Sequence, residues 1–372
     1  MIENPTDAEV EEYVDQVGGE LLPLRVMFIV TRYSCPFRCD HCFFSSNPNS
    51  KEVLPDEALD KSIDLAGRYN MSVMLTGGEP MLDPPKIFRA VERIKGYGLV
   101  AALQSSYLGD TESEVEENAE RLSKLGLDQF VTSVSQYHEK SMPASISMGY
   151  LDYVVTMIDA MTKRSIRISI KNPWDVDQAD SSEDQTHQFL GKLGEKGARL
   201  FQTPGRGPGY MATDIHGMLI DFIDPSIISV GNARSLRLVS QRAYEWESKL
   251  YHCPIFFSNH NDGLITIYPD GNVARCCSAE KKADFGFGNI LTDSFTDIVS
   301  NMLRSNYVHP FMSRVLKEGH QMLTEEFPEL LPKNGAHQAC EICSPIVSHP
   351  RARQRLAERL GNPNLFVPFT RL

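Results

Sequence analysis

Three cysteines in the run SCPFRCDHCFF have the residue type and spacing of a metal-binding loop. Cys35, Cys39 and Cys42 directly follow the apolar residues 24–31. Thiolates spaced C-x3-C-x2-C on a loop can bind three irons of a 4Fe–4S cluster and leave the fourth iron open to another ligand. The same spacing also suits a zinc site or buried thiols. The cysteines alone leave these interpretations open, and only the first provides an open iron for chemistry.

A second motif, SVMLTGGEP, lies further along the chain. Its apolar residues 72–76 are expected to form a strand that ends in Gly77, Gly78, Glu79 and Pro80. Two glycines at the end of a strand let a ligand approach the backbone closely, because neither has a side chain. The carboxylate that follows can accept hydrogen bonds from the ammonium group of a ligand. This motif predicts a binding site for a small molecule that carries an amino group.

Together, the two motifs resemble the radical S-adenosylmethionine (SAM) superfamily. In that family the open iron binds the amino and carboxylate groups of SAM, and the GGEP-type segment, here residues 77–80, binds the amino group. The resemblance implies that the reduced cluster cleaves SAM to methionine and a 5′-deoxyadenosyl radical, which abstracts a hydrogen atom from the substrate. A zinc site would not explain the GGEP segment. The family usually has an aromatic residue where this chain has His41, which leaves the adenine contact open.

The other five of the eight cysteines lie in the last third of the chain. The run NDGLITIYPDGNVARCC alternates apolar and polar residues on both sides of a Pro-Asp-Gly-Asn turn, which predicts a β-hairpin. The run QACEIC adds a C-x2-C pair. This arrangement resembles the SPASM and twitch extensions of radical SAM enzymes, and Gly271 and Cys276 fit their Gly-x4-Cys spacing. The number of cysteines favours the twitch form, which has one auxiliary cluster.

We expect one auxiliary 4Fe–4S cluster with four ligands, Cys253, Cys276, Cys340 and Cys343. Cys277 is left over, because adjacent residues of a strand point to opposite faces and only one of the pair should reach the cluster. Cys277 is then a buried small residue, exchanges roles with Cys276, or donates a proton or hydrogen atom to a substrate radical.

Between the two groups of cysteines, short apolar runs alternate with amphipathic runs, which predicts βα units around a parallel sheet. The expected strands are residues 25–31, 72–76, 99–105, 129–135, 166–171 and 200–203. The expected helices are residues 56–69, 84–95, 112–125, 149–162 and 186–196. We therefore expect an α/β fold with a partial (β/α)6 radical SAM barrel, followed by a small twitch-type domain of a β-hairpin plus helix. In βα barrels the ligand lies at the C-terminal ends of the strands, where both motifs fall.

The expected domain limits follow from this order of elements. They are an N-terminal extension at 1–23, the barrel at 24–214, a bridging segment at 215–252, the auxiliary domain at 253–347 and a C-terminal tail at 348–372.

Polar residues at other strand ends are further candidates for binding SAM or the substrate. Ser105 ends the third expected strand, and Ser133 matches a serine that contacts SAM in the family. Ser135 stands where the family has an aspartate. Each serine could equally be an ordinary strand-end hydroxyl bonded to the backbone. Candidates for the catalytic base or the substrate contact are Tyr33, His138 and Arg206, and Arg206 could pair with a carboxylate or lie in a surface turn.

Composition limits the class of protein. The 372 residues are 41% hydrophobic and 23% charged, which supports one large domain plus a smaller one. A net charge of −12 disfavours nucleic acid as a partner. No run approaches the ~20 apolar residues of a membrane span, and the acidic N-terminus is unlike a secretory signal. We therefore expect a cytoplasmic enzyme, because thiols stay reduced in that compartment.

The auxiliary cluster suggests a reaction type. A cluster with four cysteine ligands has no open iron and should transfer electrons, which favours oxidation of a small, polar, hydroxyl-bearing metabolite by analogy with enzymes that dehydrogenate aminocyclitols. The alternatives are crosslinking or epimerisation of a ribosomally made peptide, redox-neutral epimerisation of a sugar, and a non-catalytic zinc or iron–sulfur protein. Only 23 residues precede the expected barrel, which leaves little room for a leader-peptide domain. A flavodoxin or ferredoxin would supply the electron.

Overall fold

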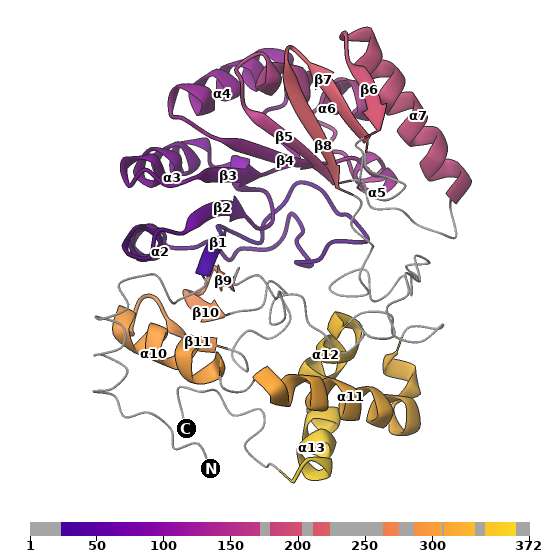
Figure 1. Ribbon diagram of the computed structural model, residues 1–372. Helices are drawn as coiled ribbons and strands as arrows, with labels where there is room; N and C mark the ends of the chain where they lie inside the picture. Colours follow the sequence, from indigo (N-terminus) through magenta and orange to yellow (C-terminus); the bar gives the residue numbers. More distant parts are fainter. Residues whose placement is uncertain are drawn as a thin grey trace.

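The computed structural model describes residues 24–171, 179–202, 211–223, 263–274, 286–306, 309–331 and 339–361. One sheet runs through the centre of this part of the chain, in the order β11-β10-β9-β1-β2-β3-β4-β5-β8-β7-β6 (Figure 1). Its strands are β1 (Leu24–Val30), β2 (Ser72–Thr76), β3 (Ala101–Gln104), β4 (Gln129–Ser133), β5 (Arg167–Lys171), β6 (Arg199–Gln202), β7 (Met211–Ile215), β8 (Met218–Ile223), β9 (Gly263–Ile267), β10 (Asn272–Ala274) and β11 (Gly286–Asn289).

The first five strands run parallel and in chain order, and each is followed by a helix. These helices are α2 (Asp56–Arg68), α3 (Pro84–Gly96), α4 (Glu112–Lys124), α6 (Tyr150–Thr162) and α7 (Ala179–Glu195). The first five expected strands and the five expected helices are confirmed, apart from shifts at their ends, and the α/β fold class with them. Helix α7 begins at Ala179 rather than at residue 186, because its acidic first turn reads as a loop in the sequence but suits a helix N-terminus.

The prediction that residues 200–203 form the sixth strand of the barrel is wrong. The strand exists as β6 but pairs antiparallel with β7, and β8 takes the place beside β5. A two-residue turn at His216 and Gly217 joins β7 to β8, and both residues have positive φ (51° and 75°), as the common hairpin turns require. The run MLIDFI of β8 therefore completes the six parallel strands, and the expected domain limit at residue 214 falls inside this hairpin.

The expected C-terminal hairpin is confirmed as β9 and β10, which pair antiparallel. Gly271 in its turn has a φ of 82° and donates its N–H to the carbonyl of Tyr268 at 2.8 Å. Strand β9 also pairs parallel with β1. The hairpin therefore extends the barrel sheet directly, a contact that the sequence did not predict.

The last three helices in the described part of the chain form a second hydrophobic core. Helix α10 (Phe295–Asn306) packs on β11, and α11 (His309–Glu326), α12 (Ala339–Ser348) and α13 (Pro350–Arg359) pack on one another below the sheet (Figure 1). Residues such as Leu316, Ile342 and Leu356 are buried between them. Among the helices that the structure describes, none has the length and apolar character needed to cross a bilayer.

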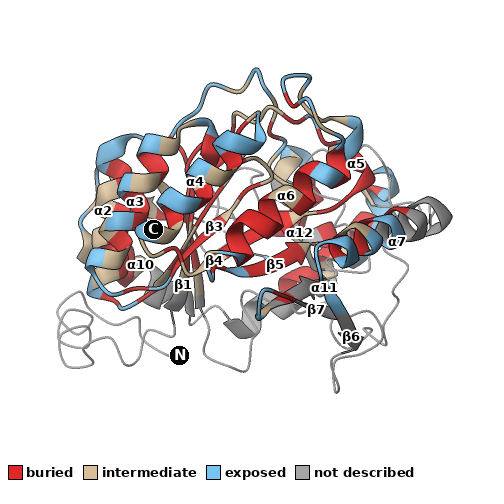
Figure 2. Cartoon of the chain, turned by 90° about the horizontal axis from the view of Figure 1, so that it is seen from above, coloured by how far each residue is buried: buried red, intermediate tan, exposed pale blue. Residues whose placement is uncertain are grey.

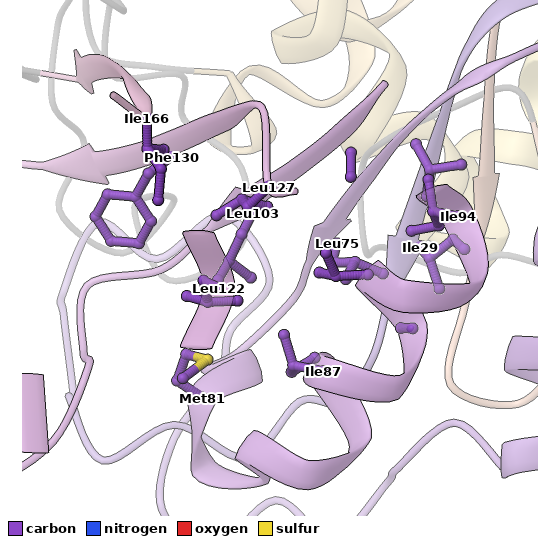
Figure 3. Close-up of a cluster of buried hydrophobic side chains, with 14 of the residues drawn as sticks. Ile29, Leu75, Met81, Ile87, Ile94, Leu103, Leu122, Leu127, Phe130 and Ile166 are labelled. Carbon is purple, nitrogen blue, oxygen red and sulfur yellow. The ribbon is translucent and has the colours of Figure 1, made fainter. Parts of the chain in front are cut away.

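Helices α2, α3 and α4 bury one side against the sheet and expose the other, whereas α6 is buried over almost its whole length (Figure 2). In Figure 3, Ile29, Leu75 and Leu103 from three neighbouring strands face apolar side chains from the helices, including Ile94 and Leu122. This layer fixes the positions of the strands, and with them the loops that leave the strands' C-terminal ends.

Replacing Phe130 in β4 tests this core. The side chain is 0% exposed, and Phe130→Ala leaves a cavity, so we expect a loss of about 3–5 kcal/mol of unfolding free energy. Val100→Ala is the matched control, because Val100 is 47% exposed and should change that energy by less than about 0.5 kcal/mol. Urea denaturation of the cluster-free protein measures both. Equal losses in the two variants would contradict the packing described.

Candidate functional site

The cysteine loop leaves the C-terminal end of β1 and folds back on itself. The Thr31 N–H donates to the Thr76 carbonyl at 2.8 Å, which extends the β1–β2 pairing by one residue. Beyond it, the Tyr33 N–H donates to the Glu52 carbonyl at 3.0 Å and the Cys35 N–H to the Asn47 carbonyl at 3.2 Å. The loop is therefore held by backbone bonds on both sides of the cysteines.

The glycine motif after β2 is hydrogen-bonded to this loop. The Gly78 N–H donates to the Arg32 carbonyl at 2.7 Å, and the Glu79 N–H donates to the Ser34 carbonyl at 2.9 Å. A Cβ on Gly77 would lie 2.5 Å from the Arg32 carbonyl oxygen, and one on Gly78 would meet the Ser34 carbonyl oxygen. The sequence predicts that these glycines let a ligand approach the backbone. In the structure, their lack of side chains lets the cysteine loop pack directly against them.

Cys35, Cys39 and Cys42 lie together in one hydrophobic cluster with Phe37 and Tyr137. The Cys42 sulfur accepts the Ser46 N–H at 3.3 Å. The Cys39 sulfur lies 3.3 Å from the Ser141 hydroxyl. None of the three is in a disulfide. Three thiols from one loop thus lie in the same partly buried cluster.

Burial keeps these thiols neutral without a metal. It raises the pKa of Cys39 to about 12 and also raises the pKa of Cys35 and Cys42. A buried thiolate needs a nearby positive charge, which iron provides when it binds. The donor set therefore suits a cation that displaces the thiol protons as it binds.

Zinc and a 4Fe–4S cluster hold thiolates differently. Tetrahedral zinc holds each sulfur at about 2.3 Å from one point, whereas a 4Fe–4S cluster takes each thiolate at a separate iron. Three cysteines of one loop that lie in one buried cluster supply the donors that a 4Fe–4S cluster with one open iron needs.

Glu79 is a buried carboxylate held by three donors. Its Oε1 accepts the Ser105 hydroxyl at 2.6 Å and the Met81 N–H at 2.9 Å, and its Oε2 accepts the Ser106 N–H at 3.0 Å. Ser105, expected to contact SAM, is therefore bonded to Glu79 and orients it. Burial raises the pKa of Glu79 to about 7, although these hydrogen bonds and Arg32 act in the opposite direction. An ammonium ligand would stabilise the ionised form.

The raised pKa of Glu79 gives a prediction about stability and pH. Because the folded-state pKa lies above the ordinary value of 4.5, ionisation destabilises the fold as pH rises from about 4.5 through about 7. Glu79→Gln stays neutral, so the wild type should lose about 3 kcal/mol relative to this variant between pH 4.5 and pH 8. Urea denaturation of cluster-free protein at several pH values measures the difference. A constant difference across the range would show that Glu79 ionises normally.

The fourth strand end is fixed by Tyr150. Its hydroxyl donates to the Ser133 carbonyl at 3.0 Å and accepts the Ser135 N–H at 3.2 Å. The Ser135 hydroxyl lies 2.7 Å from Nδ1 of His138 and caps the short helix α5 (Gln136–Lys140). Within the described residues the half-buried Ser133 hydroxyl has no hydrogen-bond partner. Of the two serines, Ser135 therefore uses its hydroxyl within the protein.

His41, which lies in the cysteine loop, packs against two rings of α5. The His41 ring lies 4.6 Å from the Tyr137 ring and 5.2 Å from the His138 ring, between ring centroids. Burial lowers the pKa of His41 to about 4 and lowers the pKa of His138 further below its ordinary value. Both rings are therefore neutral at pH 7. His41 thus behaves as a neutral aromatic ring at the position where the family has an aromatic residue.

Other expected site residues lie elsewhere. Tyr33 is buried with Val30 and Tyr268 between the cysteine loop and the C-terminal hairpin. Cys340 and Cys343 lie three residues apart on α12. The remaining candidates lie outside the described residues: Arg206, Cys253, Cys276 and Cys277.

Comparisons with known proteins identify two regions. The description "Radical SAM superfamily" matches residues 29–172, which contain the cysteine loop and the glycine motif. The description "Iron-sulfur cluster-binding domain", also named SPASM, matches residues 259–344, which contain Cys276, Cys340 and Cys343. Together the matched regions cover the barrel strands β2–β5, the last two residues of β1 and the C-terminal hairpin.

Two curated relatives are similar over part of their length. The "Putative peptide biosynthesis protein YydG" of Bacillus subtilis (strain 168) is 23% identical over 66% of this chain and 66% of its own length. The "GTP 3′,8-cyclase" of Rhizobium etli (strain CIAT 652) is 26% identical over 45% of this chain and 47% of its own. The matches therefore span less than two thirds of these relatives.

Solved structures with a similar chain course include two enzymes bound to peptides. "Native anSMEcpe with bound AdoMet and Cp18Cys peptide" aligns with a TM-score of 0.48 at 13% identity, over 92% of this chain and 98% of its own. "Streptococcus suis SuiB bound to precursor peptide SuiA" gives 0.41 at 11% identity, over 79% and 70%. The family matches imply a 4Fe–4S cluster, SAM and auxiliary iron–sulfur binding. This chain carries a radical SAM domain at residues 29–172 and a SPASM-type iron–sulfur cluster-binding domain at residues 259–344.

Proposed function

We propose that this enzyme cleaves SAM reductively at a 4Fe–4S cluster held by Cys35, Cys39 and Cys42, and abstracts a hydrogen atom from a peptide. One observation supports the first part of this proposal, the cleavage of SAM at the cluster. The glycine motif and the cysteine loop are bonded to each other through Gly78 and Glu79. A ligand that binds both an open iron and the Glu79 carboxylate needs the two motifs in fixed relation, and these bonds provide it.

Each residue of the site has a separate proposed role. The thiolates hold the cluster, and Glu79 accepts a hydrogen bond from the ammonium group of SAM. Gly77 and Pro80 shape the backbone around Glu79, and Ser133 offers its hydroxyl from the end of β4. When bound, the cluster supplies one electron for cleavage of SAM to methionine and a 5′-deoxyadenosyl radical. A flavodoxin or ferredoxin is the proposed source of that electron, and Cys253, Cys276, Cys340 and Cys343 are the proposed ligands of an auxiliary cluster.

The substrate class rests on a relative. The Bacillus subtilis protein is named for peptide biosynthesis, and its similarity extends over 253 residues. This supports a peptide substrate over the small hydroxyl-bearing metabolite expected from the sequence. Oxidation of a small alcohol remains the second candidate, because an auxiliary cluster with four cysteine ligands would accept an electron from the substrate radical. Tyr33, His138 and Arg206 stay candidates for the base in that reaction.

Deuterium transfer tests the function and separates the two substrate classes. The reconstituted enzyme, SAM and dithionite are incubated without oxygen with a low-mass extract of the source cells grown on fully deuterated medium. Abstraction from a substrate places deuterium in 5′-deoxyadenosine, which mass spectrometry detects. A second sample of extract is digested with a broad protease, which is then removed by ultrafiltration before the assay.

The outcomes are distinct. Deuterium in 5′-deoxyadenosine that disappears after protease digestion supports a peptide substrate. Label that survives digestion overturns the peptide assignment in favour of a small metabolite, and ketone formation from alcohols would then be screened. Absence of SAM cleavage in protein that holds its full iron content would contradict the proposed function itself.

A further inference from the structure

The Ser141 hydroxyl is a polar contact to the cysteine loop from another part of the chain. Ser141 follows helix α5, and its Oγ lies 3.3 Å from the Cys39 sulfur. Cys42, in contrast, receives its hydrogen bond from the backbone of the loop itself, at Ser46. The environment of Cys39 therefore depends on how α5 is placed.

Helix α5 is held in position at several points. The Ser135 hydroxyl caps it, and His138 bonds to the same hydroxyl. Glu139 accepts a hydrogen bond from Gln185 of α7 at 2.7 Å. Tyr137 is buried against the cysteine loop. These contacts fix the end of α5, and with it the distance from Ser141 to the sulfur.

One hydroxyl proton at Ser141 has competing acceptors. The hydroxyl donates to the Tyr137 carbonyl at 2.6 Å and lies 3.3 Å from the His138 carbonyl oxygen. A protonated Cys39 can donate its S–H to the Ser141 oxygen, which leaves the Ser141 proton on the Tyr137 carbonyl. A Cys39 thiolate bound to iron has no proton. The contact between sulfur and oxygen then persists only if the Ser141 hydroxyl turns and donates to the sulfur.

We propose that Ser141 donates a hydrogen bond to the Cys39 sulfur in the cluster-bound enzyme and thereby raises the reduction potential of the cluster. A donor at a ligating sulfur stabilises the reduced cluster, which carries more negative charge. Ser141 thus acts through Cys39 and eases delivery of the electron. The inference rests on ligation by Cys39 but not on the class of substrate.

Redox titration of the full-length, reconstituted enzyme tests the inference. Electron paramagnetic resonance follows the reduced-cluster signal that changes shape when SAM is added, which belongs to the cluster with the open iron. Ser141→Ala should reduce the equilibrium constant for one-electron reduction about tenfold, which lowers the midpoint potential by about 59 mV. Ser141→Thr keeps the hydroxyl and should restore the wild-type potential.

Ser145→Ala is the matched control. Its hydroxyl, four residues further along the same loop, bonds to Asp110 at 2.7 Å, so the potential should stay at the wild-type value. Equal potentials in Ser141→Ala and Ser145→Ala would overturn the inference. If Ser141→Ala fails to assemble a cluster, Ser141→Cys replaces it: the weaker S–H donor should lower the potential, and a wild-type value would overturn the inference. Loss of iron in variants of the cysteines tests ligation separately.

Discussion

The variant Cys35→Ala, Cys39→Ala, Cys42→Ala is expected to lose SAM cleavage completely and about half of its iron. Two 4Fe–4S clusters give about eight irons per chain in the wild type, and removal of one leaves about four. Cleavage is lost because SAM then has no iron to bind, and no other cluster on the chain is expected to have an open position. Iron is counted after anaerobic reconstitution, and 5′-deoxyadenosine is measured with dithionite as the reductant.

The reciprocal variant provides the control. Cys340→Ala, Cys343→Ala removes the pair on α12 and should also reduce the iron to about four, while SAM cleavage without substrate continues. If the wild type holds only about four irons and the first variant none, the C-terminal cysteines hold no cluster, and the argument for dehydrogenation is lost. Unchanged cleavage in the first variant would refute the assignment of the cysteine loop.

Gly78→Ala is expected to disable the enzyme by displacing the cysteine loop. The added Cβ would lie 2.7 Å from the carbonyl carbon of Tyr33 and would also meet the Ser34 carbonyl oxygen. Both are backbone atoms that cannot rotate away, so one strand end must move. We expect about 3 kcal/mol less unfolding free energy in the cluster-free protein and SAM cleavage about a hundredfold slower, since displacements of about 1 Å have effects of this size.

Gly96→Ala is the matched control for this substitution. Gly96 is the last residue of α3, and a Cβ there meets no atom within 4 Å. We expect no loss of cleavage and a change in unfolding free energy of less than about 1 kcal/mol, in the stabilising direction. Urea denaturation and the 5′-deoxyadenosine assay are applied to both variants. Wild-type cleavage in Gly78→Ala would show that the two motifs are not required to touch.

The cysteine loop and the glycine motif are far apart in sequence but in contact in the structure. The spacing of the cysteines and the GGEP run were enough to predict the family, because both follow strands whose C-terminal ends meet at one edge of a parallel sheet. The sequence could not show that Gly78 and Glu79 bond to the carbonyls of Arg32 and Ser34, since that depends on how the loop folds back.

The chemical environment of the site also came from tertiary structure. The sequence predicted that Glu79 binds an ammonium group. Its pKa of about 7 could not be predicted, because it results from burial of the carboxyl in the folded protein, against the hydrogen bond from Ser105. The sequence singled out Ser133 and Ser135 alike, and only Tyr150 and the cap of α5 distinguish them. No sequence signal indicated Ser141, because its contact with the Cys39 sulfur depends on the tertiary structure.

The sequence by itself determined the βα order of the barrel, the two motifs and the C-terminal hairpin, because periodicity and turn residues are local properties. Tertiary structure decided that β8 rather than β6 pairs with β5, and that the hairpin joins β1. Strand pairing is a choice among partners far apart in the chain, and it depends on which apolar faces pack together. The same packing brings the cysteine loop, Glu79 and α5 to one end of the sheet.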